Sequence, residues 1–188
     1  ELESQGLPAV HAVTLAQLGV AHARRGDRLT GSRLIQLAVA EAREHRLEHF
    51  GLIAVVHCAH SYAAALAGDR AASEAAAEQG AAIRASMVHV VARAHIQTGL
   101  LLCEAAILRR DAVSATKELQ LAQQLLPQEP EAVVFQAWAD ELTARLERLR
   151  AAGEAVELTA AERRVLGQLP THRSLVEVRA MLDAVIRA

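Results

Sequence analysis

The chain has 188 residues and a formal net charge of −2; hydrophobic residues make up 52% of it and aromatic residues 2%. This length fits one domain, or one domain with a small appendage. The charge lacks the basic excess typical of a freestanding nucleic-acid-binding protein. Alanine and leucine, which favour helices, are abundant, so we expect an all-α fold.

No stretch approaches the ~18 consecutive apolar residues of a transmembrane helix, and no signal peptide is visible. Cys58 and Cys103 lie far apart in the sequence and match no metal-binding spacing. This cysteine usage indicates a reducing compartment rather than a disulfide framework. We therefore expect a cytoplasmic protein without membrane contact. Because the chain begins with Glu1 rather than methionine, we expect it to be a fragment of a longer protein.

Three pairs of helices are expected in order, over residues 8–46, 48–86 and 88–127. The break inside each pair ends in an aspartate, and these aspartates stand 42 positions apart, at Asp27, Asp69 and Asp111. Aspartate suits the N-cap of the following helix, and Gly26 and Gly68 suit the left-handed position that ends the preceding one. Paired helices at a fixed period indicate a helical solenoid.

Within the pairs, the residue pattern resembles that of tetratricopeptide repeats. In the first pair Leu18-Gly19 precedes Gly26-Asp27 at the spacing found in that family, and Pro127 closes the third pair. The period of 42 residues is longer than the usual repeat of ~34 residues. The resemblance implies a tetratricopeptide-like helical-hairpin solenoid, with an irregular helical bundle as the alternative.

A further helix over residues 130–152 is expected to cap the solenoid. Pro130 and the acidic residues beside it suit a helix N-terminus. The residues expected to face inward are Val134, Ala137, Trp138, Leu142, Leu146 and Leu149. Gly153 is expected to end this helix and to begin a link to a second part. The predicted domains are therefore residues 1–153 and 154–188.

The first helix of each pair is expected to line the concave face of the solenoid, where such proteins bind partners. Transferring the tetratricopeptide pattern by position gives six residues for this groove: Val20, Cys58, Tyr62, Gln97, Leu100 and Glu104. A mostly apolar groove with few polar groups can take a small ligand or an amphipathic helix of a protein partner. The other interpretation is that close helix packing buries these residues and leaves no groove.

The sequence contains no recognisable catalytic motif. It has no glycine-rich phosphate-binding loop, no Gly-x-Ser-x-Gly and no His-Glu-x-x-His, so we expect neither enzymatic activity nor a cofactor. His57 and His60 share a helix face, and a zinc site there would need a further ligand such as His89 or His95. An imidazole bonded to a backbone carbonyl is the simpler interpretation, so we expect no metal site.

The last part of the chain contains two predicted short helices, each opened by a capping box. Thr159 and Glu162 form the first capping box, and Ser174 and Glu177 form the second. Pro170 ends the first of these helices because it has no N–H to donate. The residues of this motif are Thr159, Glu162, Val165, Leu166, Ser174, Glu177, Val178 and Leu182.

This pattern resembles the opening of the LuxR-type helix-turn-helix. The Leu-Pro-Thr-His sequence at residues 169–172 resembles the variant found in large, ATP-binding, MalT-like regulators. The resemblance covers residues 158–182 and stops before the recognition helix that enters the major groove. Arg179 also stands where the family has a small alanine. We therefore expect a truncated or degenerate helix-turn-helix, and DNA binding only if a recognition helix follows in the full-length protein.

The resemblance implies a non-catalytic sensor module of a transcriptional regulator, with an ATPase domain upstream. Such a module would bind a protein partner or a small ligand in its repeat groove and relay the signal to neighbouring domains. The alternative is a protein-interaction scaffold of a signalling protein such as a serine/threonine kinase, without DNA binding. A homodimer is a further option, because terminal repeats of a solenoid can expose apolar faces.

Overall fold

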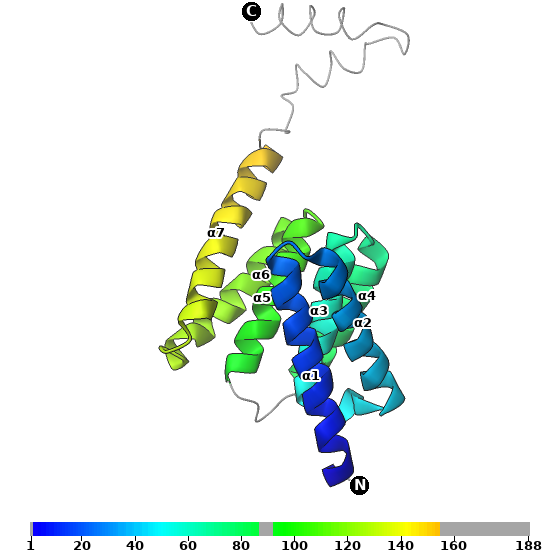
Figure 1. The fold of residues 1–188 in the computed structure, drawn as a ribbon. Helices are drawn as coiled ribbons and strands as arrows, with labels where there is room; N and C mark the ends of the chain where they lie inside the picture. Colours follow the sequence, from blue (N-terminus) through cyan, green and yellow to red (C-terminus); the bar gives the residue numbers. More distant parts are fainter. Residues whose placement is uncertain (1, 87–91, 155–188) are drawn as a thin grey trace, which may run out of the picture. The chain divides into compact units, whose positions relative to one another are not determined.

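The computed structural model describes residues 2–86 and 92–154, and every regular element in these ranges is a helix (Figure 1). In chain order the helices are α1 (Leu2–Arg24), α2 (Arg28–Glu44), α3 (Ala54–Leu66), α4 (Arg70–Ala85), α5 (Ala92–Leu108), α6 (Ala112–Leu125) and α7 (Val133–Glu154). Short 3-10 turns are η1 (Leu47–His49), η2 (Gly51–Ile53) and η3 (Leu126–Gln128). The predicted all-α fold is confirmed for these residues. None of the described helices is long and apolar enough to cross a membrane.

The first six helices pack as three consecutive pairs, α1 with α2, α3 with α4, and α5 with α6. The helices within a pair run antiparallel, because a short connection turns the chain back on itself. Neighbouring pairs also touch, since α3 packs against α1, α2 and α5 (Figure 1). The first helix of the middle pair is therefore surrounded by other helices.

Asp27, Asp69 and Asp111 each cap the helix that follows, as the sequence predicts. In each case the backbone N–H three residues further on donates a hydrogen bond to the carboxylate, at 3.0 or 3.1 Å. The residue before each aspartate has the left-handed conformation that ends a helix. Gly26 and Gly68 adopt it with φ angles of 95° and 79°. Short local patterns therefore set the boundary inside each pair.

Small residues let the two helices of a pair approach closely. In the first pair, a β-carbon added to Gly19 would lie 2.7 Å from Cγ1 of Ile35 and 2.8 Å from the carbonyl oxygen of Gly31. Ser61 and Ser73 stand 42 positions further on, and each hydroxyl donates to the other residue's carbonyl oxygen, at 2.9 and 2.8 Å. Both serines are fully buried. The second pair thus has reciprocal hydrogen bonds where the first has a glycine contact.

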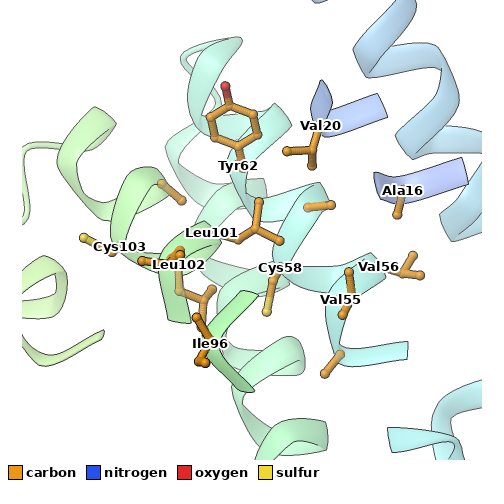
Figure 2. Packing of buried hydrophobic residues seen from close by; sticks show 14 of the residues in the cluster. Ala16, Val20, Val55, Val56, Cys58, Tyr62, Ile96, Leu101, Leu102 and Cys103 are labelled. Atoms are coloured by element: carbon orange, nitrogen blue, oxygen red, sulfur yellow. The ribbon is translucent and has the colours of Figure 1, made fainter. Parts of the chain in front are cut away.

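The hydrophobic core extends through the three pairs and into α7. It is built largely of alanine together with leucine, isoleucine and valine. Figure 2 shows side chains of α1, α3 and α5 gathered around Cys58. On α7, Trp138, Leu142 and Leu146 are buried, as the helical spacing predicts, whereas Val134 is 78% exposed and Ala137 is exposed as well. Ala139, which is not among the expected residues, is fully buried.

A buried ion pair joins the second and third helix pairs. Arg84 of α4 donates to both carboxylate oxygens of Glu118 of α6, at 2.6 and 3.0 Å. The two side chains are only 13% and 11% exposed. This bidentate geometry is the strong form of an arginine–carboxylate contact, so it orients the two pairs as well as joining them.

Four helix boundaries differ from those expected from the sequence. α1 begins at Leu2 rather than near residue 8, and Pro8 lies inside it. α3 begins at Ala54 rather than near residue 48, because Phe50 is extended, with φ −85° and ψ 114°, and separates two short 3-10 turns. α7 begins at Val133 rather than at residue 130, so Pro130 lies in the turn before the helix and not in its first turn. The helix continues through Gly153 to Glu154, since a glycine within a helix costs only about 1 kcal/mol.

Candidate ligand-binding site

Four of the six residues predicted for the groove do not lie in an open cleft. Val20, Cys58 and Leu100 have at most 5% of their surface exposed, so they pack between helices. Gln97 is partly buried and its side-chain oxygen accepts a hydrogen bond from Gln17 of α1, at 3.0 Å. At the three apolar positions the structure agrees with the second interpretation, in which close packing buries the predicted groove residues.

The other two residues, Tyr62 and Glu104, border a cleft of about 320 Å³. It lies at the carboxyl ends of α1, α3 and α5, and α7 contributes another wall. Its polar lining residues are Arg24, Arg28, Tyr62, Glu104, Glu141 and Arg145. This volume is near the lower end of the ~300–1,000 Å³ found for small-molecule sites.

A smaller apolar hollow of about 140 Å³ adjoins the cleft. The hollow shares Ala23, Arg28 and Leu66 with the cleft. Ala63 and Ala67 provide further apolar lining from α3 and the turn after it. A charged cleft and a mainly apolar hollow therefore adjoin each other, and Arg28 lines both.

The carboxylate of Glu104 joins three helices at the cleft. It is only 4% exposed. It accepts hydrogen bonds from Arg24 of α1 at 2.5 Å, from Arg145 of α7 at 2.6 Å, and from Nε1 of Trp138 of α7 at 2.9 Å. A buried carboxylate is costly unless it is paired and hydrogen-bonded. These three donors meet that requirement, so Glu104 holds α1 and α7 against α5.

Glu141 of α7 contacts the same two arginines from the solvent side. It is 48% exposed, accepts a hydrogen bond from Arg24 at 2.6 Å, and lies 3.5 Å from Arg145. The guanidinium of Arg24 also lies over the ring of Trp138, 4.3 Å from its centroid, in a cation–π arrangement. We call Arg24, Glu104, Trp138, Glu141 and Arg145 the ion-pair cluster.

Two polar groups of the cleft lie outside the ion-pair cluster. Tyr62 is only 3% exposed, and its hydroxyl has no hydrogen-bond partner among the described residues. Figure 2 shows this hydroxyl pointing away from the apolar side chains around its ring. Burial and the charge of Glu104 raise the pKa of Tyr62 to about 12, so the hydroxyl keeps its proton. Arg28 is exposed and makes no ion pair within the described part of the chain.

The sequence pattern identified two residues of this cleft but missed its arginines. The 42-residue spacing places Arg24 at the position equivalent to Leu66 and Leu108, at the end of the first helix of each pair. An arginine at a position where the other two pairs have leucine is a signal in the sequence that could have marked Arg24 as a candidate site residue. Arg145 and Trp138 carry no such signal, because α7 has no counterpart in the repeating pairs.

The histidines of α3 belong to no group of three or more possible metal ligands among the described residues; His89 lies outside them. His57 is 2% exposed, and its Nε2 has no hydrogen-bond partner there. This differs from the carbonyl-bonded imidazole expected from the sequence. Burial, together with the nearby positive charges of His60 and Arg43, lowers the pKa of His57 to about 4.

Replacing His57 with leucine is expected to flatten the pH dependence of stability. Because the pKa falls from 6.5 to about 4 on folding, the neutral ring contributes fully above about pH 6.5, and stability is lost as the pH falls toward 4. Between pH 7 and pH 5 the free energy of unfolding of the wild-type chain should fall by about 2 kcal/mol because of His57. In His57→Leu most of this fall should be absent. Urea unfolding at both pH values measures this, with the exposed His45→Gln as control. Equal losses in wild type and His57→Leu contradict the prediction.

The two cysteines offer no reactive thiol. Cys58 and Cys103 are both free and buried, and burial raises the pKa of each thiol to about 12. Nucleophilic attack needs the thiolate, which is scarce at neutral pH when the pKa is so high. The polar groups that line the cleft are guanidinium groups, carboxylates and one hydroxyl.

The predicted helix-turn-helix residues, Thr159 to Leu182, lie outside the described residues, so this part of the interpretation stays a prediction. The chain divides into two units, residues 1–150 and 151–188, and the second is described only as far as residue 154. Comparisons with known protein families, with curated proteins and with solved structures found no match to this chain.

Proposed function

We propose that this chain is the non-catalytic sensor region of a cytoplasmic transcriptional regulator that resembles the MalT-like members of the LuxR family. A tetratricopeptide-like solenoid is supported by three helix pairs in which a capping aspartate recurs every 42 residues. The free, buried cysteines support a reducing compartment. In the full-length protein, an ATPase domain would lie upstream, and DNA binding would require a recognition helix after residue 188.

The role we propose is to bind a small ligand or a protein partner in the cleft and to relay that binding along α7. The observation that carries this proposal is the buried carboxylate of Glu104, which holds both α1 and α7 at the edge of the cleft. A ligand that binds in the cleft changes the electrostatic field at the Arg24 and Arg145 ion pairs that hold α7, and α7 leads directly into residues 155–188. Such coupling needs two states that bind the ligand differently, and breakable ion pairs provide that difference.

Amide hydrogen exchange on the whole chain tests the relay. Arg145→Gln removes the charged contact between α7 and Glu104, and we expect faster exchange both in the second half of α7 and in residues 155–188. The matched control is Arg93→Gln, which breaks an exposed ion pair with Glu129 at 2.9 Å. This control should leave exchange in both segments unchanged.

If Arg145→Gln leaves exchange in residues 155–188 the same as in the control, the cleft is not coupled to that segment. That result would favour the second function, a protein-interaction scaffold of a signalling protein such as a serine/threonine kinase. A scaffold binds through its surface and does not need α7 to report the state of the cleft.

A further inference from the structure

We propose that the cleft binds a small carboxylate with an aliphatic body, and that Arg28 and the Tyr62 hydroxyl recognise the carboxylate. This inference rests on the proposed ligand-binding function and specifies the chemistry of the ligand. It concerns the two polar groups of the cleft that lie outside the ion-pair cluster.

The charge balance of the cleft leaves room for one negative charge. Three arginines line it, whereas only two carboxylates do. Arg24 and Arg145 are already paired with Glu104 and Glu141. Arg28 makes no ion pair among the described residues, so its guanidinium is available to an incoming anion.

The hydroxyl of Tyr62 is a second donor that lacks an acceptor. The side chain is nearly fully buried and borders the cleft, yet no described residue accepts a hydrogen bond from it. The ring is buried, but the hydroxyl oxygen is not one of the enclosed polar atoms without a partner, so it faces the cleft, where water or a ligand can accept its hydrogen bond. A carboxylate held by Arg28 would provide such an acceptor, because it has several lone-pair positions on two oxygens.

The same residues select against a more highly charged ligand. Glu104 and Glu141 both line the cleft, and their charges repel an anion that enters it. One unpaired guanidinium and one neutral hydroxyl can compensate a single negative charge but not two. A carboxylate is therefore favoured over a phosphate group, which carries a charge of about −1.5 to −2 at neutral pH.

The adjoining hollow indicates what the rest of the ligand is like. Its lining is mainly aliphatic, with Ser32 as the one uncharged polar residue and Arg28 shared with the cleft; the aliphatic residues are Ala23, Ala63, Leu66 and Ala67. A short hydrocarbon chain in this hollow would bury apolar surface while its carboxylate stays beside Arg28. The arrangement fits an aliphatic acid, either free or as the end of a peptide with an aliphatic last residue.

The chain carries its own reporter for this site. Trp138 is the one tryptophan in the sequence, and its indole N–H bonds to Glu104 while Arg24 lies over its ring. An added negative charge in the cleft changes the electric field at the indole. Tryptophan fluorescence therefore reports occupancy of this cleft rather than of a distant surface.

The test is a titration of the whole chain with hexanoate and with its uncharged analogue hexanamide. Calorimetry decides whether binding occurs, and Trp138 fluorescence decides where. We expect saturable binding of hexanoate with a change in fluorescence, and binding of hexanamide that is weaker by about tenfold or more. Inorganic phosphate should bind more weakly than hexanoate.

Two variants assign the binding to the proposed groups. Tyr62→Phe removes only the hydroxyl, and Arg28→Gln removes only the exposed charge; each is expected to weaken hexanoate binding about tenfold. The control is Arg33→Gln, which removes an exposed arginine of α2 that does not line the cleft. Thermal unfolding by circular dichroism verifies that each variant is folded.

A pair of leucine-ending tripeptides, one with a free carboxyl end and one amidated, identifies the source of the carboxylate. Tighter binding of the free peptide than of hexanoate points to a chain end, and tighter binding of hexanoate points to a free acid; either supports the proposal. The proposal is overturned if neither hexanoate nor the free-ended peptide binds, or if hexanamide binds as tightly as hexanoate. It is also overturned if Tyr62→Phe and Arg28→Gln both bind hexanoate like wild type. These outcomes are independent of the exchange experiment, so a failed relay and a wrong ligand class are told apart.

Discussion

Replacing Glu104 with glutamine is expected to lower the free energy of unfolding by about 3 kcal/mol. Glutamine keeps the shape of the side chain and can still accept a hydrogen bond from Trp138. It cannot neutralise Arg24 and Arg145, whose side chains are only 26% and 23% exposed. Glu141 still contacts both arginines from the solvent side, but one carboxylate then faces two largely buried guanidinium groups, so one positive charge is left uncompensated.

Urea unfolding followed by circular dichroism measures this loss. Glu141→Gln is the matched control, because it makes the same substitution against the same two arginines at a site that is 48% exposed. An exposed ion pair contributes little, so the control should lose less than about 1 kcal/mol. Equal losses in Glu104→Gln and Glu141→Gln would show that burial gives Glu104 no special weight in holding α1 and α7 together.

Gly19→Ala is expected to destabilise the fold by about 2–3 kcal/mol, although alanine normally favours a helix over glycine. The added methyl group would lie 2.7 Å from Cγ1 of Ile35 and 2.8 Å from the carbonyl oxygen of Gly31. The second contact is with backbone, so no change of rotamer relieves it. α1 and α2 would have to move apart, which disrupts the packing of the whole first pair.

Gly80 offers the matched comparison for this prediction. A β-carbon there would lie 2.7 Å from the sulfur of Cys58, which is a side-chain atom that can be removed. The double variant Gly80→Ala with Cys58→Ala should therefore be destabilised by about 1 kcal/mol less than the sum of the losses in the two single variants. Thermal and urea unfolding of the variants measures both effects. A Gly19→Ala chain that is as stable as wild type would mean that the α1–α2 contact is looser than these distances indicate.

The ends of the helix pairs could be predicted from the sequence because the interactions that set them are local. The carboxylate of Asp27 bonds to a backbone N–H only three residues further on, and Gly26 needs only its own positive φ. The start of α3 could not be predicted in this way. Arg46 ends α2 in the left-handed conformation with φ 50°, a role that glycine usually signals. Arg46 takes this conformation without being a glycine, so the sequence does not show the end of α2. The extended backbone at Phe50 has no recognisable sequence pattern either.

The cleft itself was decided only by the tertiary structure. The 42-residue period placed Tyr62 and Glu104 on the inward face of their helices, and it placed Cys58 on the same face, yet Cys58 is fully buried. The Arg24–Glu104 and Arg145–Glu104 contacts span 80 and 41 residues. Helical periodicity assigns a side chain to one face of its own helix. Whether that face is covered, and which charges meet there, depends on the distance and angle between helices, and these follow from how side chains far apart in the sequence pack against one another.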